Sequence, residues 1–441
     1  MATSSVTSSG LGSGLDVDSI VSKLVAADRS ATDTRLDATE LKTNVQISAL
    51  GSMKSSMSSL GTVLTSLNVS GLGKRTATVS DSSLLTATAS NTAQPGSTQI
   101  EVLSLAKAHK IGSGSFASSS AVVGEGSFTI GVGSQSFSVN LSSTTTVAGL
   151  RDAINNASDN KGVTATLVQE DGGVRLVLTS KNTGTASALS VTSTATSFSD
   201  LQAASDAQIK VDGYTRTSSY NTIVGVVDGV NIDLLKAQVG TTTTITVAAD
   251  QKAATDAITS FVDAYNSLLS TYKSLTAYDA ATSSGGALMG DASTRAAMQA
   301  LRSGLSSSVD SGTYQMLSQI GISTQLDGTL KIDSDKLSAA LSADSASVQK
   351  LFNGTGGIAT QLSATLKNYA GDDGQFDTKL DALNKQLQKV DDDRDALDLR
   401  MEKAETRYRA QFSSLDSIVS KYNNVASYLD QMDNERYKLK S

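Results

Sequence analysis

The chain of 441 residues contains 36 Lys and Arg against 43 Asp and Glu, one proline, one histidine and no cysteine, and its net charge is -7. The missing cysteine excludes disulfide frameworks and Cys-ligated metal sites, and a single imidazole cannot build a histidine metal cluster. Mild acidity without a dense basic block argues against duplex nucleic acid as a partner, and no apolar run of about 18 residues predicts a membrane span.

The N-terminal segment predicts a flexible tail followed by a helix. Residues 1–14 (MATSSVTSSGLGSG) lack the basic and apolar regions of a cleavable signal peptide, which fits either a cytoplasmic protein or export through an uncleaved terminus. Asp16 is the expected helix cap, and Ile20 and Leu24 begin an apolar stripe. A second stripe has the three-and-four spacing of a coiled-coil seam and ends at Gly71: Leu50, Met53, Met57, Leu60, Leu64 and Leu67.

Residues 74–250 change to short β-like runs separated by Gly, Asn, Asp and Ser. The expected strands are 99–105, 127–132, 137–141, 163–168, 174–178, 223–227, 230–235 and 243–247. Asp228-Gly229 predicts a hairpin turn, and 147–155 predicts one short helix. We interpret this region as two small β-rich domains, one inserted into the other. Its Ser/Thr-rich strand faces fit exposed sheet faces, with an adhesive surface as the alternative.

Helical periodicity returns at Gln251 and reaches its greatest length near the C-terminus. A helix over 251–275, another over 291–305, a hairpin at 326–330 and a helix capped by Asp333 are expected. From about 378 the chain has seam spacing as far as Leu429, with Arg394 as a polar break and a stutter at Phe412. A continuous helix over 380–429 would be roughly 75 Å long, so it must pair with the N-terminal helix or a neighbouring subunit.

Three polar features carry no predicted chemistry. His109 is expected to be an ordinary residue at the rim of a strand, beside Lys107 and Lys110. The acidic stretch 371–374 is expected to be a solvated turn, because the spaced carboxylates of a calcium loop are missing. The run 391–393 is expected on the wet face of the long helix.

Several segments, in order along the chain, resemble the bacterial flagellar filament cap proteins, the flagellar hook-associated protein 2 family. They are GLGSGLDVDSIVSKLVAAD (10–28), IEVLSLAKAHK (100–110), FVDAYNSLLS (261–270), LSQIGISTQLDGTLKIDSDKLSAAL (317–341), VQKLF (348–352) and RYRAQFSSLDSIVSKYNNVASYL (407–429). Residues 127–192 also resemble a repeat of flagellins and their relatives. The tail after Leu429 (DQMDNERYKLKS) is more charged than an apolar leg, which leaves the end of the leg helix open.

The resemblance implies a secreted, non-enzymatic protein without cofactor or metal. Such a protein leaves through the flagellar type III export channel and acts at the extracellular tip of the flagellum. There it retains flagellin and promotes flagellin folding and polymerisation. The implied partners are flagellin, further copies of the chain in a closed ring (tetramer to hexamer), hook–filament junction proteins, an export chaperone at the C-terminal helix, and host glycans or mucin.

The expected fold class is α+β multidomain, with a coiled-coil or helical-bundle stem at the termini and two inserted antiparallel β-rich head domains. The expected domains are leg helices (1–38 with 405–441, largely disordered when unassembled), a helical stem (39–73 with 251–404), a β-rich head (74–110 with 206–250) and an inserted β-rich head (111–205). The candidate interface with neighbouring subunits or flagellin comprises two apolar groups, for which packing within the chain is the alternative: Leu15, Val17, Ile20, Leu24, and Phe412, Leu415, Val419, Tyr422, Leu429.

Two other kinds of protein stay open from the sequence. Another flagellar axial protein, a flagellin or a hook–filament junction protein, would share the helical ends and the β-rich middle. A surface adhesin with β-rich binding domains on a helical stalk would also fit. A filament cap is the leading hypothesis because the resembling segments follow the order of that family.

Overall fold

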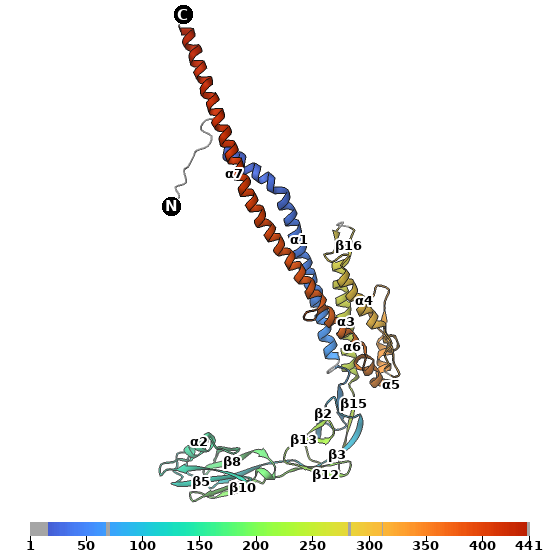
Figure 1. The fold of residues 1–441 in the computed structure, drawn as a ribbon. Helices are drawn as coiled ribbons and strands as arrows, with labels where there is room; N and C mark the ends of the chain where they lie inside the picture. The colour runs from blue at the N-terminus through green and yellow to red at the C-terminus, as the bar shows by residue number, and fades with distance from the viewer. Residues whose placement is uncertain (1–15, 68–70, 281–283, 311, 439–441) are drawn as a thin grey trace. The chain divides into compact units, whose positions relative to one another are not determined.

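The computed structural model describes residues 16–67, 71–280, 284–310 and 312–438, and the side chains of 435–438 are left out. The chain divides into two compact units. The helical unit comprises 1–65, 259–337 and 350–441, and the β unit comprises 66–258 and 338–349. Terminal helices in one unit and antiparallel sheets in the other confirm the predicted α+β fold class (Figure 1).

Long helices dominate the helical unit. The helices that contribute to it are α1 (Val17–Ser66), α3 (Gln251–Thr276), α4 (Ala292–Ser306), α5 (Ser334–Asn353), α6 (Ile358–Ala370) and α7 (Gln375–Lys438), with a 3-10 turn at Leu317–Ile320. Two small hairpins pair β16 (Tyr278–Asp279) with β17 (Ser284–Gly285), and β18 (Ile322–Thr324) with β19 (Leu330–Ile332). Both α1 and α7 run without a break through the predicted leg boundaries at 38 and 404.

The predicted helix starts are confirmed by their capping bonds. The Asp16 carboxylate accepts from the Ser19 N–H at 3.0 Å, and the Asp333 carboxylate accepts from the Lys336 N–H at 3.1 Å. The helix expected from 291 begins one residue later, because Asp291 is itself the cap and accepts from the Thr294 N–H at 2.9 Å. Each carboxylate satisfies an amide that the first helical turn leaves without a partner.

The periodic apolar stripes form the core of the helical unit. The α1 stripe from Leu50 to Leu64 is buried, as are Phe261, Tyr265 and Leu268 on α3. Phe261 also meets Phe352 of α5 edge to face, with ring centroids 5.8 Å apart. Stripes spaced at three and four residues lie on one face of each helix, so burial of these faces packs the helices together.

The first lobe of the β unit packs two antiparallel sheets around an aliphatic core. One sheet has the order β1-β15-β3-β11-β12 and the other β13-β14-β2. Ile100, Ile209, Ile232 and Ile245 are among the buried residues that the sheets share. The strands are β1 (Arg75–Val79), β2 (Leu85–Ala89), β3 (Gly96–Ser104), β11 (Ala207–Val211), β12 (Tyr214–Ser218), β13 (Thr222–Val227), β14 (Val230–Leu234) and β15 (Thr242–Ala249). The predicted Asp228-Gly229 hairpin joins β13 to β14, and Gly229 has the positive φ of 71° that this turn requires.

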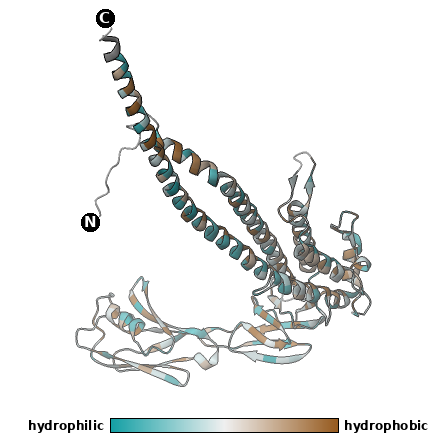
Figure 2. Cartoon of the chain, turned by 45° about the horizontal axis from the view of Figure 1, so that its top comes forward, coloured by the Kyte–Doolittle hydropathy of each residue, from teal (hydrophilic) through white to brown (hydrophobic). Residues whose placement is uncertain are grey.

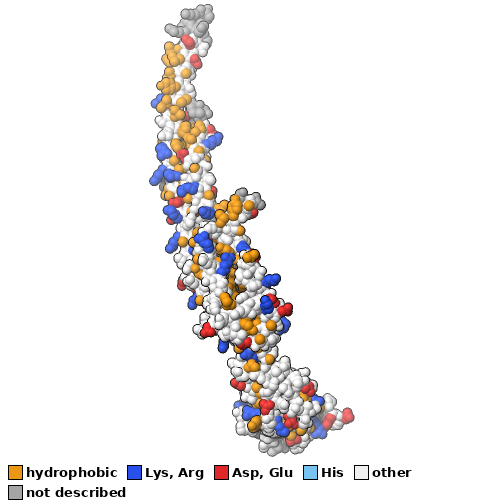
Figure 3. Space-filling view, turned by 90° about the vertical axis from the view of Figure 1, so that its right-hand side faces the viewer, with side chains coloured by type: hydrophobic (Ala, Val, Ile, Leu, Met, Phe, Trp, Pro, Cys, Tyr) orange, Lys and Arg blue, Asp and Glu red, His pale blue; other side chains and the backbone are white. Residues whose placement is uncertain are grey.

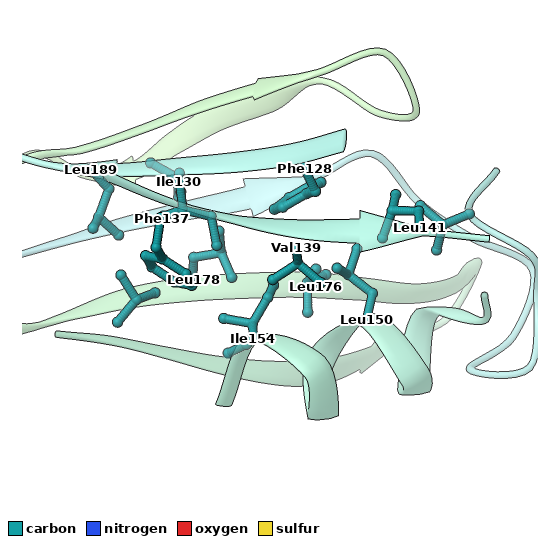
Figure 4. Packing of buried hydrophobic residues seen from close by; sticks show 14 of the residues in the cluster. Phe128, Ile130, Phe137, Val139, Leu141, Leu150, Ile154, Leu176, Leu178 and Leu189 are labelled. Carbon is teal, nitrogen blue, oxygen red and sulfur yellow. The ribbon is translucent and has the colours of Figure 1, made fainter. Parts of the chain in front are cut away.

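The second lobe has its own core, shown in Figure 4, between two sheets and one helix. Its sheets have the orders β10-β4-β8-β7 and β6-β5-β9. Leu150 and Ile154 of α2 (Val147–Asn156) point into this core, as the period of the expected helix predicts. The strands are β4 (Ala108–Ser113), β5 (Gly126–Val132), β6 (Gln135–Leu141), β7 (Val163–Glu170), β8 (Gly173–Thr183), β9 (Leu189–Ser193) and β10 (Phe198–Gln202).

The β3–β11 ladder shows how one lobe is inserted into the other. These two strands pair antiparallel, with Val102 opposite Ile209 and Ile100 opposite Val211. All strands from β4 to β10 lie between them in the sequence. The chain therefore leaves the first lobe after β3, builds the second lobe and returns as β11.

Several strands escaped sequence analysis because their side chains are mostly polar or exposed. The segments RTATV (β1), FSDLQ (β10) and YTRTS (β12) are strands in which no residue is fully buried. All three are edge strands, which hydrogen-bond to one neighbour only. Backbone pairing with a neighbour holds such strands, and it leaves no apolar alternation to detect.

The expectation that His109 is an ordinary rim residue is wrong. His109 lies within β4, and only 7% of its surface is exposed. Its Nδ1 accepts from the Leu189 N–H at 2.7 Å, which places the ring proton on Nε2, 3.2 Å from Asp200 Oδ1. The imidazole thus links β4 to its sheet neighbour β10 and to β9 of the other sheet. The neighbouring Lys110 hid this burial, because a pleated strand turns adjacent residues to opposite faces.

Replacing His109 by Leu should destabilise the β unit, because it leaves the buried Leu189 N–H without its acceptor. We expect a loss of about 1–3 kcal/mol in the free energy of unfolding, measured by denaturant titration. The matched variant His109→Asn keeps an acceptor oxygen at the δ position and should lose less. Equal stability of the Leu variant and the original chain would contradict this role.

Candidate assembly surface

Helices α1 and α7 form an antiparallel pair along the helical unit, as Figures 1 and 2 show. Their contacts run in opposite directions along the two helices. Lys54 near the end of α1 pairs with Asp377 at the start of α7, and Asp18 at the start of α1 pairs with Arg409. The long C-terminal helix therefore pairs with the N-terminal helix of the same chain over 377–409.

A narrow apolar seam closes this pair. Leu36 of α1 packs against Val390, Leu397 and Met401 of α7, and all four are less than 8% exposed. Val25 packs on the same cluster. The α7 residues follow the spacing of seven and four that keeps one face toward the partner helix. The seam is thin, so each buried side chain contributes a large share of the pairing energy.

Polar contacts beside the seam set the register of the two helices. The Arg394 guanidinium, the predicted polar break, reaches Asp37 and Glu40 at 2.6 Å each. Hydrogen bonds to Glu40 and then Asp37 raise the pKa of Arg394 above its ordinary value. The Tyr408 hydroxyl donates to Asp28 at 2.7 Å. Since exposed ion pairs contribute little to stability, their effect is to favour this register over others.

Beyond Arg409 the apolar face of α7 is exposed to solvent. Six side chains on it are between 44 and 71% exposed: Leu415, Ile418, Tyr422, Val425, Leu429 and Met432. Their spacing of three and four residues alternates without a break, so they lie along one face of the helix. Figure 3 shows hydrophobic side chains gathered along this end of the rod. We call these six residues the α7 stripe.

The structure places the predicted interface residues in three different settings. Leu415, Tyr422 and Leu429 belong to the α7 stripe, while Phe412 and Val419 lie beside it and are half-buried.

Of the N-terminal group, Val17 is only 2% exposed, Ile20 is half-buried and Leu24 is 38% exposed. Leu15 lies outside the described residues. The role of both groups as an interface stays a prediction.

Three members of the stripe are not among the predicted interface residues: Ile418, Val425 and Met432. The predicted seam passes through Val419 and treats Phe412 as a stutter, whereas the exposed face of the helix passes through Ile418. The alternation from Leu415 to Met432 was present in the sequence and could have identified the stripe. The helix itself continues through Phe412 to Lys438.

A metal-ligand cluster and a membrane-spanning helix are both absent from the described residues. Among them, no group of three or more His, Cys, Asp or Glu side chains is arranged to hold a metal ion. Within the same residues, no helix combines the length and apolar character needed to cross a bilayer.

Comparisons with known proteins agree in one family. Family models described as the N-terminus and C-terminus of flagellar hook-associated protein 2 match residues 13–109 and 204–424, and the flagellin hook IN motif matches 127–182. The A-type flagellar hook-associated protein 2 of Pseudomonas aeruginosa is 33% identical, with 97% of each chain covered. The flagellar hook-associated protein 2 of Escherichia coli K12 is 32% identical, with 97% of this chain and 98% of that protein covered.

A solved structure extends the likeness to the fold. The D1-D2-D3 domains of the flagellar cap protein FliD from Escherichia coli match with a TM-score of 0.66 and 30% identity. The match covers 76% of this chain and 99% of the solved chain.

Truncation of single α7 side chains should affect stability differently in the part of the helix that pairs with α1 and in the α7 stripe. Leu397→Ala removes a side chain that is 3% exposed, and we expect a loss of at least about 2 kcal/mol in the free energy of unfolding. Leu429→Ala removes one that is 58% exposed and should change stability by less than about 0.5 kcal/mol. Thermal unfolding followed by far-UV circular dichroism tests both, and equal effects would show that the stripe is buried within the monomer.

Proposed function

The chain belongs to the flagellar hook-associated protein 2 family and is a flagellar filament cap, and from this premise we propose that several copies form a closed ring at the distal tip of the filament. The ring, a tetramer to a hexamer, retains flagellin that leaves the export channel. It promotes the folding and polymerisation of flagellin beneath it. A cap fits the matches over nearly the whole chain better than a flagellin, a junction protein or an adhesin does.

The observation that carries this proposal is the α7 stripe. Six apolar side chains along one face of the ordered helix, each at least 44% exposed, carry an unfavourable free energy of hydration. Their heptad spacing fits a partner helix rather than a small molecule. In the proposed assembly, helices of neighbouring cap subunits and of flagellin cover the stripe.

The N-terminal part of the stem supports the same role. The last contacts between α1 and α7, Asp18 with Arg409 and Asp28 with Tyr408, join exposed groups. Such contacts contribute little, so this end of the pair can open and repack at low cost. We propose that 1–38 and 405–441 act as legs between filament subunits, and that α7 beyond Arg409 is largely disordered in the unassembled protein.

Further partners follow from the same surfaces. An amphipathic helix with a free apolar face is a suitable ligand for the groove of an export chaperone, so we propose that the α7 stripe is covered before export by type III secretion. Hook–filament junction proteins are proposed to hold the cap before the filament grows. The exposed Ser/Thr-rich strands, such as β12, are the proposed site for host glycans. The role is structural, and we propose that the chain has no enzymatic activity.

A charge placed in the stripe should abolish cap function. In a strain whose own cap gene is deleted, the original chain should restore filaments and swimming. The same strain carrying the double variant Tyr422→Asp/Leu429→Asp should secrete flagellin monomer without forming filaments, because two carboxylates cannot be buried against a partner helix. Motility plates and electron microscopy of filaments provide the measurements.

The matched control adds the same charge to the opposite face. Asn424 and Ser427 are exposed and lie about 200° around the helix from Tyr422 and Leu429, respectively. The strain carrying Asn424→Asp/Ser427→Asp should therefore swim as well as the strain carrying the original chain. Normal filaments with the Tyr422→Asp/Leu429→Asp variant would overturn the proposed role of the stripe.

A further inference from the structure

We infer that neighbouring copies of this chain contact each other through a rigid hairpin tip on one copy and an apolar hollow on the next. The tip carries Leu326 between β18 and β19, and the hollow lies between α1 and the end of α3. Both belong to the helical unit. This inference rests on the proposed ring and names a contact that closes it.

The hairpin tip presents a fully exposed leucine. The relative exposure of Leu326 is 111%, the highest among the large apolar side chains of the described residues. Its turn is closed by the Gln325 N–H, which donates to the Thr329 carbonyl at 2.8 Å, and by the Gly328 N–H, which donates back to the Gln325 carbonyl at 2.9 Å. Gly328 has a φ of 86°, a conformation that disfavours other residues. An apolar side chain is thus displayed where it gains nothing within its own chain.

The turn is held in a single shape by the side chain of Asp327. Its Oδ1 accepts from the Thr329 hydroxyl at 2.6 Å and from the Thr329 N–H at 3.0 Å. These bonds, with a smaller effect of Lys273, lower the pKa of Asp327 to about 2. The carboxylate is therefore charged at neutral pH, where it accepts both bonds.

The hairpin is also anchored to α3. The Asn266 side chain donates to the Leu330 carbonyl at 2.9 Å and accepts from the Leu330 N–H at 2.8 Å. The Lys273 ammonium lies 3.3 Å from Asp327. A tip ordered before binding loses little conformational entropy when it binds, which makes it a favourable anchor for an interface.

The hollow has the size and chemistry to accept this tip. It is lined by apolar Val45, Ala49, Leu275 and Ala287, with Asn44, Ser48 and Ser52 among its polar residues, and its volume is about 410 Å³. The hollow is open to solvent, and its apolar lining offers a leucine side chain a surface to pack against. The Asn44 amide and the Ser48 hydroxyl supply donors for Asp327, whereas the Ser52 hydroxyl already donates to the Ser48 carbonyl. No carboxylate lines the hollow.

The geometry of α3 makes a second copy the occupant. Lys273 faces the hairpin, whereas Leu275, two residues further, lines the hollow. Two helical residues are about 200° of rotation, so the tip and the hollow lie on opposite sides of α3. The tip of one copy therefore cannot fill its own hollow. A protrusion and a recess on opposite sides of one subunit generate a head-to-tail contact, the kind that closes into a ring.

Disulfide trapping tests this contact directly, because the natural chain contains no cysteine. Under mild oxidation, the double variant Leu326→Cys/Val45→Cys should give a ladder of covalent oligomers that ends at the size of the ring. Each single variant should remain uncrosslinked, since a head-to-tail contact does not bring two tips or two hollows together. The control Leu326→Cys/Leu399→Cys, with Leu399 59% exposed on α7, should give no ladder.

The outcomes separate this contact from the proposed ring. A ring seen by electron microscopy, without specific crosslinking of the Leu326→Cys/Val45→Cys variant, would overturn the contact and leave the cap intact. A full-length chain that stays monomeric at high concentration, while restoring no filaments, would overturn the ring as well. Crosslinking of position 326 to flagellin alone would also overturn the contact, because the occupant would then be flagellin.

Removal of the tip side chain provides a second measurement without cysteine. Leu326→Ala should raise the concentration at the midpoint of ring assembly by at least about tenfold, as loss of a central anchor does. Leu399→Ala should leave that midpoint unchanged. An unchanged midpoint for Leu326→Ala would overturn the contact, and circular dichroism should show unaltered folding because the Leu326 side chain is fully exposed.

Discussion

The unequal lengths of the two antiparallel stem helices constrain the rest of this molecule. Helix α7 has 64 residues and α1 has 50, which correspond to roughly 96 and 75 Å at about 1.5 Å per residue. Pairing begins near Lys54 and Asp377 and ends near Asp18 and Arg409, so the last part of α7 has no described partner in its own chain. That part keeps its apolar face exposed, and in the proposed assembly another chain covers it.

The β unit is built to be independent of this requirement. The β3–β11 ladder joins the two strands of the first lobe that flank the insertion, and each lobe has a separate hydrophobic core. His109 links strands of both sheets inside the second lobe. Two cores that are satisfied within the chain can fold before assembly, whereas the proposed role of the end of α7 requires neighbouring chains. This division suits a protein whose head forms first and whose legs fold against a filament.

The sequence predicted the features that repeat and missed those that depend on distant contacts. Regular spacing identified the stripes of α1, α3 and α7, and carboxylates marked the caps at Asp16 and Asp333. The polar strand β12 and the buried His109 escaped, since their environment comes from residues far along the chain. In the stripe, the path through Val419 obscured Ile418. The hairpin at 326–330 was predicted, but the exposure of Leu326 and the hollow on the other side of α3 depend on tertiary structure.

Hydrogen exchange of the α7 amides tests the central claim most directly. In the dilute monomer, we predict slow exchange where α7 pairs with α1, up to about Arg409, and fast exchange from Leu415 to Met432. In the assembled cap, the second segment should become protected to a similar degree. Equal protection of both segments in the monomer, unchanged on assembly, would contradict the view that the end of α7 needs a partner chain.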